Sequence, residues 1–451
     1  MPDSRPNVLL MHAHDLGRHL GCYGVDIETP RIDALASEGA LFERQFASAP
    51  QCSPSRGSLM TGRAPHVNGL MGLAHGDWEL HDDERILPQY LSDAGYETHL
   101  FGLQHISQDT DRLGYDHVHS EGNLYPGVSP TVHQANRGRN VASVVESFLA
   151  KSAYEAPFFA SVGFFECHRV EERNGRYGFD AGYYRADDPE SVRPLPYLPD
   201  RRGIRHDLGE MHGMVYALDE AVGSVLDALA RAGLVEETLV VFTTEHGIAF
   251  PRAKGTCYDA GIEAALAIRY PGVVDAGRRY DDLVSNVDVL PTILELVGAN
   301  RPAGLDGRSI AGLIADGVGG YDERDRIFAE MTWHDTYNPV RAIRTDRYKY
   351  IRNFWHLPTV YLPADVFASE SGREVREAYG LPSRPYEELY DLRDAPREDD
   401  NVAHEPRYRD IRRELSAQLH EWMNGTDDPL LDGPVIPGDY DEIHSWPHNE
   451  P

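Results

Sequence analysis

Short apolar runs alternate along the first 300 positions with segments whose apolar residues recur at helical spacing. The runs predict buried strands: NVLLM (7–11), PFFASVGFF (157–165), TLVVFTT (238–244) and AALAIRY (264–270). The other segments predict helices: TPRIDALASEGALF (29–42), with Thr29 as N-cap, EMHGMVYALDEAVGSVLDALARAG (210–233), which stops at Gly233, and VDVLPTILELVG (287–298). This alternation predicts an α/β fold, a large mostly parallel or mixed sheet sandwiched by helices.

The pattern changes after about Gly320. RAIRTDRYKYIRN (341–353) alternates in the way expected of a half-exposed antiparallel strand, and EELYDLRDAPREDD (387–400) predicts a strand and a turn. RYRDIRRELSAQLHEWM (407–423) predicts an amphipathic helix. We therefore expect a catalytic α/β domain over residues 1–320. A smaller C-terminal α+β subdomain with a loop-rich tail is expected over residues 321–451.

The composition is strongly acidic. Lys and Arg total 43 against 73 Asp and Glu, which gives a formal net charge of −30. A nucleic-acid partner requires a basic patch, so no nucleic-acid ligand is expected. Lysine occurs only at Lys151, Lys254 and Lys349. Because salt screens the self-repulsion of so acidic a chain, the acidic excess predicts a halophilic protein in a salt-adapted cytoplasm.

The chain shows no targeting or membrane pattern. The opening apolar run is too short for a signal peptide, and no stretch approaches the ~18 apolar residues that would span a bilayer. We therefore expect a cytoplasmic protein without a membrane partner. Its four cysteines are irregularly spaced, so we expect reduced thiols rather than a disulfide framework or a Cys-pair zinc site: Cys22, Cys52, Cys167 and Cys257.

Polar residues follow the predicted strands. In an open α/β sheet, ligands bind beyond the carboxyl ends of the strands. One polar strand end is usually an ordinary solvated turn, but four of them would converge on one edge of the sheet. Two strand ends rich in carboxylates and imidazoles could also clasp a divalent cation, with His14, Asp15, Glu245 and His246 as its ligands. The four strand ends are HAHD (12–15), GLQH (102–105), ECHR (166–169) and EHG (245–247).

The segment SPSRGSLMTGR (53–63) predicts a helix that ends at Gly62. Cys52 would then lie at its N-terminus, where free N–H groups favour an anion and a thiolate would be activated. The alternative is a small buried cysteine. Arg56 and Lys254 are candidate anion-binding residues. Because lysine is nearly absent elsewhere, Lys254 is expected to have a role that arginine cannot fill.

The residues around Cys52 complete a long motif, C-x-P-x-R followed by L-x-T-G-R. By this motif the chain resembles the sulfatase family of the alkaline phosphatase superfamily. Within that family, CSPSRGSLMTG and GIAFPRAKG are similar to the sulfamidase (N-sulfoglucosamine sulfohydrolase) branch. Similar segments run along most of the chain: RPNVLLMHAHDLGRHLGCYG (5–24), VVFTTEHG (240–247), KGTCYDAGIEAALAIRYPG (254–272) and ELYDLRDAPREDDNVA (388–403).

The resemblance implies a sulfuric ester hydrolase with two cofactors. One is a formylglycine, made from Cys52 by a maturation enzyme, and the other is a divalent metal ion, calcium by resemblance. The implied reaction releases inorganic sulfate from a sulfate ester or sulfamate on a small sugar-type substrate. The implied residue roles are metal ligation by His14, Asp15, the residue at position 52, Glu245 and His246; support of the formylglycine by Arg56; and contact with the sulfate or leaving group by His105, His168 and Lys254.

Four positions depart from the family pattern. His14 and Glu245 each stand where Asp is usual, Leu103 where a sulfate-binding lysine is expected, and Phe165 where His or Asn is common. Imidazoles suit manganese or zinc better than calcium, so the identity of the metal stays open.

Two loops carry candidates for contact with the leaving group. They are GLAHGDWEL (72–80), with His75 and Asp77, and MTWHDTYN (331–338), with His334 and Asp335; each is more often an ordinary loop. Two other functions also stay open: a phosphoester or phosphonate monoester hydrolase that uses the same residues, and a non-catalytic protein that binds sulfated sugars.

Overall fold

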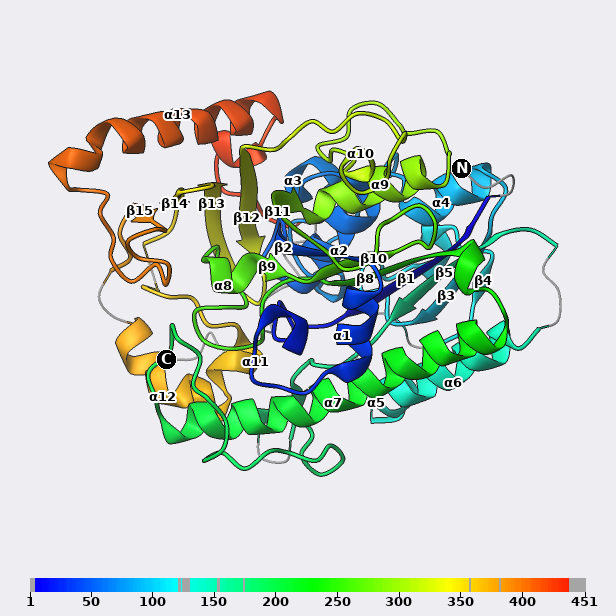
Figure 1. The fold of residues 1–451 in the computed structure, drawn as a ribbon. Helices are drawn as coiled ribbons and strands as arrows, with labels where there is room; N and C mark the ends of the chain where they lie inside the picture. The colour runs from blue at the N-terminus through cyan, green and yellow to red at the C-terminus, as the bar shows by residue number, and fades with distance from the viewer. Residues whose placement is uncertain are drawn as a thin grey trace.

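A mixed nine-stranded sheet forms the centre of the protein in the computed structural model, which describes residues 5–120, 123, 130–151, 155–172, 175–356, 358–380 and 383–437 (Figure 1). Its strand order is β11-β2-β10-β8-β1-β5-β3-β4, with β9 paired to β2. The strands are β1 (Asn7–Ala13), β2 (Ala40–Phe46), β3 (Glu97–Gly102), β4 (His117–Val118), β5 (Phe158–Gly163), β8 (Thr238–Thr244), β9 (Glu263–Ala264), β10 (Leu266–Arg269) and β11 (Arg278–Ser285).

Helices cover both faces of this sheet, which confirms the predicted fold class. Successive side chains of the central strand β1 point to opposite faces of the sheet, as the two-residue period of a strand requires. Val8 and Leu10 pack with α2, α4 and α9, whereas Leu9 and Met11 pack with α6 and α7. These helices are α2 (Cys52–Thr61), α4 (Leu87–Asp93), α6 (Gly138–Leu149), α7 (Arg202–Arg231) and α9 (Val289–Leu296).

The predicted helix over residues 29–42 is wrong in its last third. The helix α1 (Pro30–Ser37) ends early, and ALF begins the strand β2. At Gly39 a Cβ would lie 2.2 Å from the carbonyl oxygen of Ile268 on β10, so the backbones of the two segments approach closely there. The strand β10 pairs antiparallel with both β2 and β8, which makes the sheet mixed.

A second sheet of four antiparallel strands lies in the C-terminal part of the chain (Figure 1). The segment 341–353, predicted as one strand, is two, because a turn at Asp346 and Arg347 separates β13 from β14. The strands are β12 (Arg326–Trp333), β13 (Tyr337–Thr345), β14 (Tyr348–Asn353) and β15 (Glu387–Asp391), and the predicted amphipathic helix is α13 (Arg409–Gly425).

The two sheets share a hydrophobic core. One buried cluster joins Val8 and Leu10 of the large sheet to Ile343 and Leu389 of the small one. The division at residue 320 therefore stays a prediction. The remaining elements are short: α3 (Pro65–Asn68), α5 (Pro130–Ala135), β6 (Val170–Glu171), β7 (Tyr177–Gly178), α8 (Asp259–Ile262), α10 (Ala311–Ile314), α11 (Ala364–Phe367) and α12 (Glu370–Gly380). Within the described ranges, none of the helices has the length and apolar character needed to cross a bilayer.

Candidate active site

Four strand ends meet at one edge of the large sheet. The strands β3, β5, β1 and β8 are adjacent and mutually parallel, so the residues that follow each of them emerge on the same side. His105, His168, Asp15 and Glu245 follow these four strands in that order. The chain reaches this edge again after β2, which also runs parallel to β8, and there begins α2 with Cys52 as its first residue. The predicted convergence is therefore present in the structure.

The predicted metal ligands form a compact buried cluster. Ligand atoms of His14, Asp15, Cys52 and Glu245 all lie within 4.8 Å of one another. The Nε2 atom of His246 is 3.2 Å from both Asp15 Oδ1 and Glu245 Oε1, and His14 Nδ1 is 2.6 Å from Glu245 Oε1. Asp15 has a left-handed backbone with φ of 44°, a strained conformation of the kind that is stored at functional sites.

The hydrogen bonds of this cluster fit a bound cation. His246 Nδ1 lies 2.8 Å from the carbonyl oxygen of Gly247, which can only accept, so Nδ1 carries the proton and a neutral ring turns the Nε2 lone pair toward the carboxylates. Within the described part of the chain, this Nε2 and His14 Nδ1 face carboxylate oxygens at 3.2 and 2.6 Å, but neither nitrogen has a hydrogen bond of good geometry. A cation among these lone pairs would satisfy all of them.

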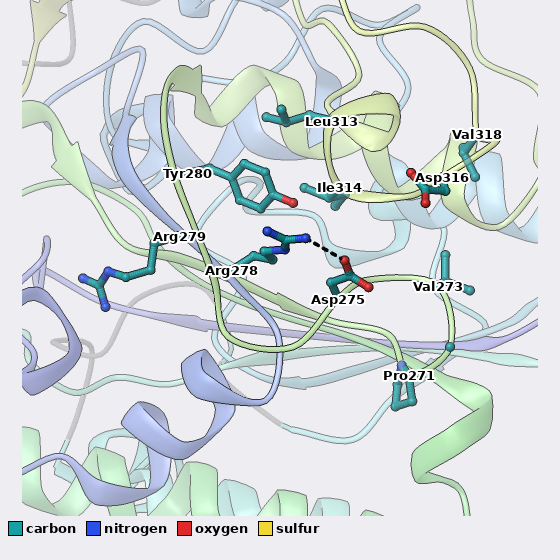
Figure 2. A pocket seen from close by; sticks show the side chains of 11 residues that line it. Pro271, Val273, Asp275, Arg278, Arg279, Tyr280, Leu313, Ile314, Asp316 and Val318 are labelled. Carbon is teal, nitrogen blue, oxygen red and sulfur yellow. Dashed lines mark hydrogen bonds and ion pairs between the residues drawn. The ribbon is translucent and has the colours of Figure 1, made fainter.

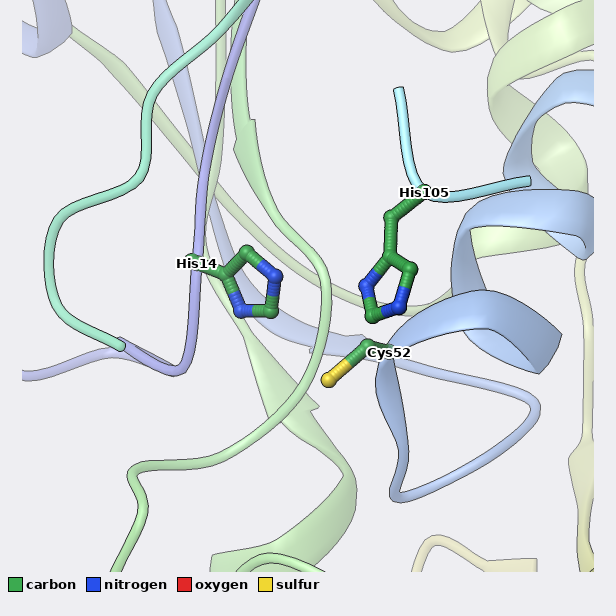
Figure 3. Close-up of side chains that lie close together, drawn as sticks. All are labelled: His14, Cys52 and His105. Atoms are coloured by element: carbon green, nitrogen blue, oxygen red, sulfur yellow. The ribbon is translucent and has the colours of Figure 1, made fainter. Parts of the chain in front are cut away.

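Cys52 lies at the centre of this edge. Its Sγ is 3.8 Å from Asp15 Oδ1, and Cys52 lies beside the imidazoles of His14 and His105, with one ligand atom of each residue within 4.8 Å of the others (Figure 3). Burial raises the pKa of the Cys52 thiol well above its ordinary value, and Glu245 and Asp15 raise it further against the opposing effect of Lys254 and Arg56. This environment favours the neutral thiol of the unmodified residue, as in the alternative of a small buried cysteine, and the activated thiolate stays a prediction.

Arg56 holds the metal cluster in place from α2. Its Nε donates to Glu245 Oε2, and its Nη1 lies 2.7 Å from His12 Nδ1. The guanidinium keeps the pKa of the Glu245 carboxyl well below its usual range although burial opposes this, and His14 and His246 act in the same direction. The Leu103 side chain is fully buried.

Lys254 is 1 % exposed and bridges two carboxylates. Its Nζ donates to Asp15 Oδ2 at 2.8 Å and to Asp365 Oδ2 at 2.9 Å. The lysine was predicted as an anion-binding residue, and in this structure the anions that it holds are the protein's own. Burial of Asp365 raises the pKa of its carboxyl, but Lys254 lowers that pKa to about 2, so the carboxylate is ionised near neutral pH.

The two histidines expected to contact the sulfate or the leaving group, His105 and His168, flank the cluster. The rings of His168 and His14 meet edge to face with centroids 4.6 Å apart, and His168 Nδ1 lies 2.5 Å from the Arg169 carbonyl oxygen. His105 Nε2 lies 3.0 Å from His75 Nδ1. Burial, assisted by Lys254, lowers the pKa of His168 to about 3, and burial lowers that of His75 to about 4. Contacts therefore link the four imidazoles of His75, His105, His14 and His168.

The predicted leaving-group residues divide into two groups. His75 contacts His105, and burial lowers the pKa of His75, with His334 lowering it further. Burial raises the pKa of Asp365, whereas Lys254 and, to a smaller extent, His334 lower it. Asp335 lies 3.2 Å from His334 Nδ1 and accepts from the backbone N–H of Ala364 at 2.6 Å, one residue before Asp365. Asp77 is different, because it is exposed and its carboxylate accepts from Gln108.

Three residues of this edge were not predicted. Asp365 completes the Lys254 bridge, His12 contacts Arg56, and Asn286 donates to the backbone oxygen of Ser55 at 2.9 Å. His12 had a signal, since it shares a strand face with His14 in HAHD. Asp365 and Asn286 had none, because ADVF and SNVD resemble many surface segments.

A separate cavity of about 610 Å³ lies along the edge strand β11 (Figure 2). Arg278 and Asp275, three residues apart on its lining, form an ion pair at 3.3 Å, and the side chains of Tyr280 and Leu313 form an apolar part of the wall. None of the predicted site residues lines it. The converging strand ends, rather than this cavity, therefore define the candidate site.

Comparison with known proteins supports this assignment. The family model described as Sulfatase matches residues 6–299, and the model described as N-sulphoglucosamine sulphohydrolase, C-terminal, matches residues 245–383. The chain is 31 % identical to the human N-sulphoglucosamine sulphohydrolase, over 96 % of this chain and 92 % of the relative. It is 26 % identical to an ulvan-active sulfatase of Formosa agariphila, over 94 % of this chain and 76 % of the relative.

The fold has solved counterparts with more than one chemistry. A phosphonate monoester hydrolase of Agrobacterium radiobacter superposes with a TM-score of 0.70 at 21 % identity, covering 94 % of this chain and 96 % of that one. At this identity the likeness shows the fold alone, so the family follows from the sequence matches. On those matches, the chain belongs to the sulfatase family of sulfuric ester hydrolases.

Proposed function

We propose that this protein is a formylglycine-dependent sulfohydrolase that releases inorganic sulfate from a small sulfated sugar, as a sulfate ester or a sulfamate. The observation that carries the proposal is the position of Cys52. It is the first residue of α2, buried, and within reach of His14, Asp15 and Glu245. A formylglycine made there by a maturation enzyme would stand where the helix N-terminus and a cation both favour negative charge.

The two added groups would supply distinct chemistry. A hydrated formylglycine supplies one hydroxyl that attacks sulfur and a second hydroxyl whose deprotonation releases the sulfate. A divalent cation held by His14, Asp15, Glu245 and His246 supplies Lewis-acid polarisation. Calcium is implied by the family resemblance, and the imidazole ligands keep manganese and zinc open.

The chain's own residues would support this reaction from fixed positions. Arg56 and Lys254 orient the carboxylates Glu245 and Asp15 through buried ion pairs, which places the metal ligands before substrate arrives. His105 or His168 would protonate the departing oxygen or nitrogen. The negative charge of a bound sulfate favours the protonated imidazole and so opposes the lowering of its pKa by burial.

The substrate class is proposed from the relatives. Two of them are named for carbohydrate substrates, N-sulphoglucosamine and ulvan, and the match to the first extends through its C-terminal model. His334 and Asp335 lie in the turn between β12 and β13, and Asp335 accepts from the backbone N–H of Ala364 beside Asp365 of the Lys254 bridge, so they are the proposed contacts to the sugar. The cytoplasmic location and the salt adaptation stay predictions.

One experiment separates this proposal from its alternatives. Intact mass spectrometry of protein co-expressed with a maturation enzyme should show a chain lighter by about 18 Da, as expected when a thiol becomes an aldehyde. The same sample should release sulfate from N-sulfoglucosamine or an aryl sulfate. Faster turnover of an aryl phosphonate monoester would instead establish the phosphonate hydrolase. Binding of the sulfated sugar without turnover by modified protein would establish the non-catalytic alternative.

A further inference from the structure

Histidines gather at the opposite end of β3 from the active site. Glu97 and His99 are two residues apart on β3, so they share one face of the strand, and the neighbouring strand β4 begins with His117. The two strands are parallel, with His99 directly beside His117. His119 follows on the same side and stacks on His99 with ring centroids 5.4 Å apart.

The side-chain atoms converge on one point. Glu97 Oε1 is 2.7 Å from His117 Nε2 and 3.9 Å from His99 Nε2, and one ligand atom from each of the three residues lies within 4.8 Å of the other two. Ligands of a tetrahedral zinc ion with bonds of about 2.0–2.1 Å are separated by roughly 3.3 Å. Ligand atoms up to 4.8 Å apart would have to approach by as much as about 1.5 Å, which is within the reach of the partly exposed Glu97 and His117 side chains.

A buried and unsatisfied nitrogen points into this cluster. His99 is 1 % exposed, and its Nε2 makes no hydrogen bond within the described ranges. Its Nδ1 lies 3.1 Å from His119 Nε2. When Nδ1 donates its proton to His119, the lone pair of His99 Nε2 faces Glu97 and His117. A protein that buries a nitrogen in this way usually gives it a partner.

We propose that Glu97, His99 and His117 form a second metal site, suited to zinc and separate from the Cys52 cluster. Two imidazoles and one carboxylate are ligands that zinc prefers, and His119 would be the positioning residue that fixes the His99 ring. His117 and Glu97 side chains are 49 % and 39 % exposed, so the ion could enter from solvent and keep a water as its fourth ligand.

Such an ion would act on stability rather than on catalysis. The strand β4 is the outermost strand of the large sheet and spans only His117–Val118. A metal bound by both β3 and β4 would cross-link this short edge strand to the sheet. The active-site residue His105 follows the carboxyl end of β3, whereas Glu97 is at its amino end. The proposal therefore does not depend on the proposed function.

The test is a comparison of zinc binding by full-length variants. Chelator-treated wild type, His117→Ala and Glu97→Gln are dialysed against Zn²⁺ and analysed for bound metal and for melting temperature. Both substituted side chains are partly exposed, so the variants should fold. His420→Ala, an exposed histidine on α13 outside the cluster, is the matched control. Any zinc bound at the Cys52 cluster is common to all four proteins and cancels in the comparison.

Wild type and the control should each bind one Zn²⁺ per chain more than the two variants, and zinc should raise their melting temperature further. His119→Gln should keep the site but weaken it about 10- to 100-fold, the usual effect of losing a partner that orients a metal ligand. Equal zinc stoichiometry and equal zinc-induced melting shifts in wild type, His117→Ala and Glu97→Gln would overturn the proposal, whatever their hydrolytic activity.

Discussion

Removal of the Lys254 ammonium group tests how this active site is held together. The residue is buried, and its single nitrogen lies between Asp15 Oδ2 and Asp365 Oδ2 at 2.8 and 2.9 Å. In Lys254→Ala both carboxylates would face each other without a cation. Loss of one partner from a buried ion pair costs about 3–5 kcal/mol, because the remaining charge stays buried and unpaired. We expect a loss of stability in this range.

The effect on activity should be larger than the loss of folded protein explains. Lys254 orients Asp15, which is a predicted metal ligand, and loss of one preorganised electrostatic contact typically costs ~10²–10³ in rate. Lys254→Arg should lose almost as much. A planar guanidinium is larger than an ammonium and cannot place one nitrogen between two oxygens in the same buried space, and overpacking costs about 1–3 kcal/mol.

The assay combines urea unfolding with kcat/KM on an aryl sulfate and on a sulfated glucosamine. Asp365→Asn combined with Lys254→Ala is the matched control, since removing one carboxylate charge should restore part of the lost stability without restoring activity. Intact mass shows whether position 52 is modified equally in each protein. Near wild-type kcat/KM in Lys254→Arg on every accepted substrate would refute this account of the bridge.

Three further predictions address other parts of the molecule. Cys52→Ser should fold normally but release no more than one sulfate per chain, because a serine provides no second hydroxyl; sustained turnover, followed by ion chromatography of sulfate, would contradict this. Chelation should remove one divalent ion together with activity, and elemental analysis of active protein without metal would exclude the metal role of His14 and Asp15. Burial raises the pKa of Glu398 to about 7 even though Lys349 is near. A carboxyl whose folded pKa exceeds its unfolded value loses stability as pH rises between the two, so wild type should lose about 3 kcal/mol relative to Glu398→Gln between pH 4.5 and 7. If the unfolding free energies of the two proteins change equally with pH across that range, Glu398 is not buried as a neutral acid.

Much of the framework could be predicted from the sequence because its signals are local. A run such as NVLLM or TLVVFTT has too few polar residues for a surface segment, and Gly233 and Gly62 are the left-handed residues that end or cap helices. The strand ends were predictable for the same reason. A polar group placed directly after a buried parallel strand must emerge at the carboxyl edge, which is how His14, Asp15, Glu245 and His246 could be assigned together.

Local signals failed where a distant segment decided the outcome. The helix predicted over residues 29–42 ends at Ser37 because β10, more than 220 positions later, approaches the backbone at Gly39. The same limit hid the surroundings of Cys52. A helix N-terminus lowers the pKa of a thiol, whereas burial and the neighbouring Glu245 and Asp15 raise that of Cys52, and neither carboxylate is near Cys52 in the sequence.

Local sequence patterns were therefore enough to predict most strands and helices, the sheet edge at which the polar residues emerge, and the motif around Cys52. Which charged side chains contact one another depends on the three-dimensional arrangement of the chain. Lys254 and Asp365 are 111 positions apart, and Glu97 and His117 are 20 apart on two strands. Burial and periodicity act on neighbours along the chain, whereas an ion pair or a metal site depends on the distance between side chains in space. That distance depends on the order of the strands in the sheet, and no short segment of the sequence predicts the strand order.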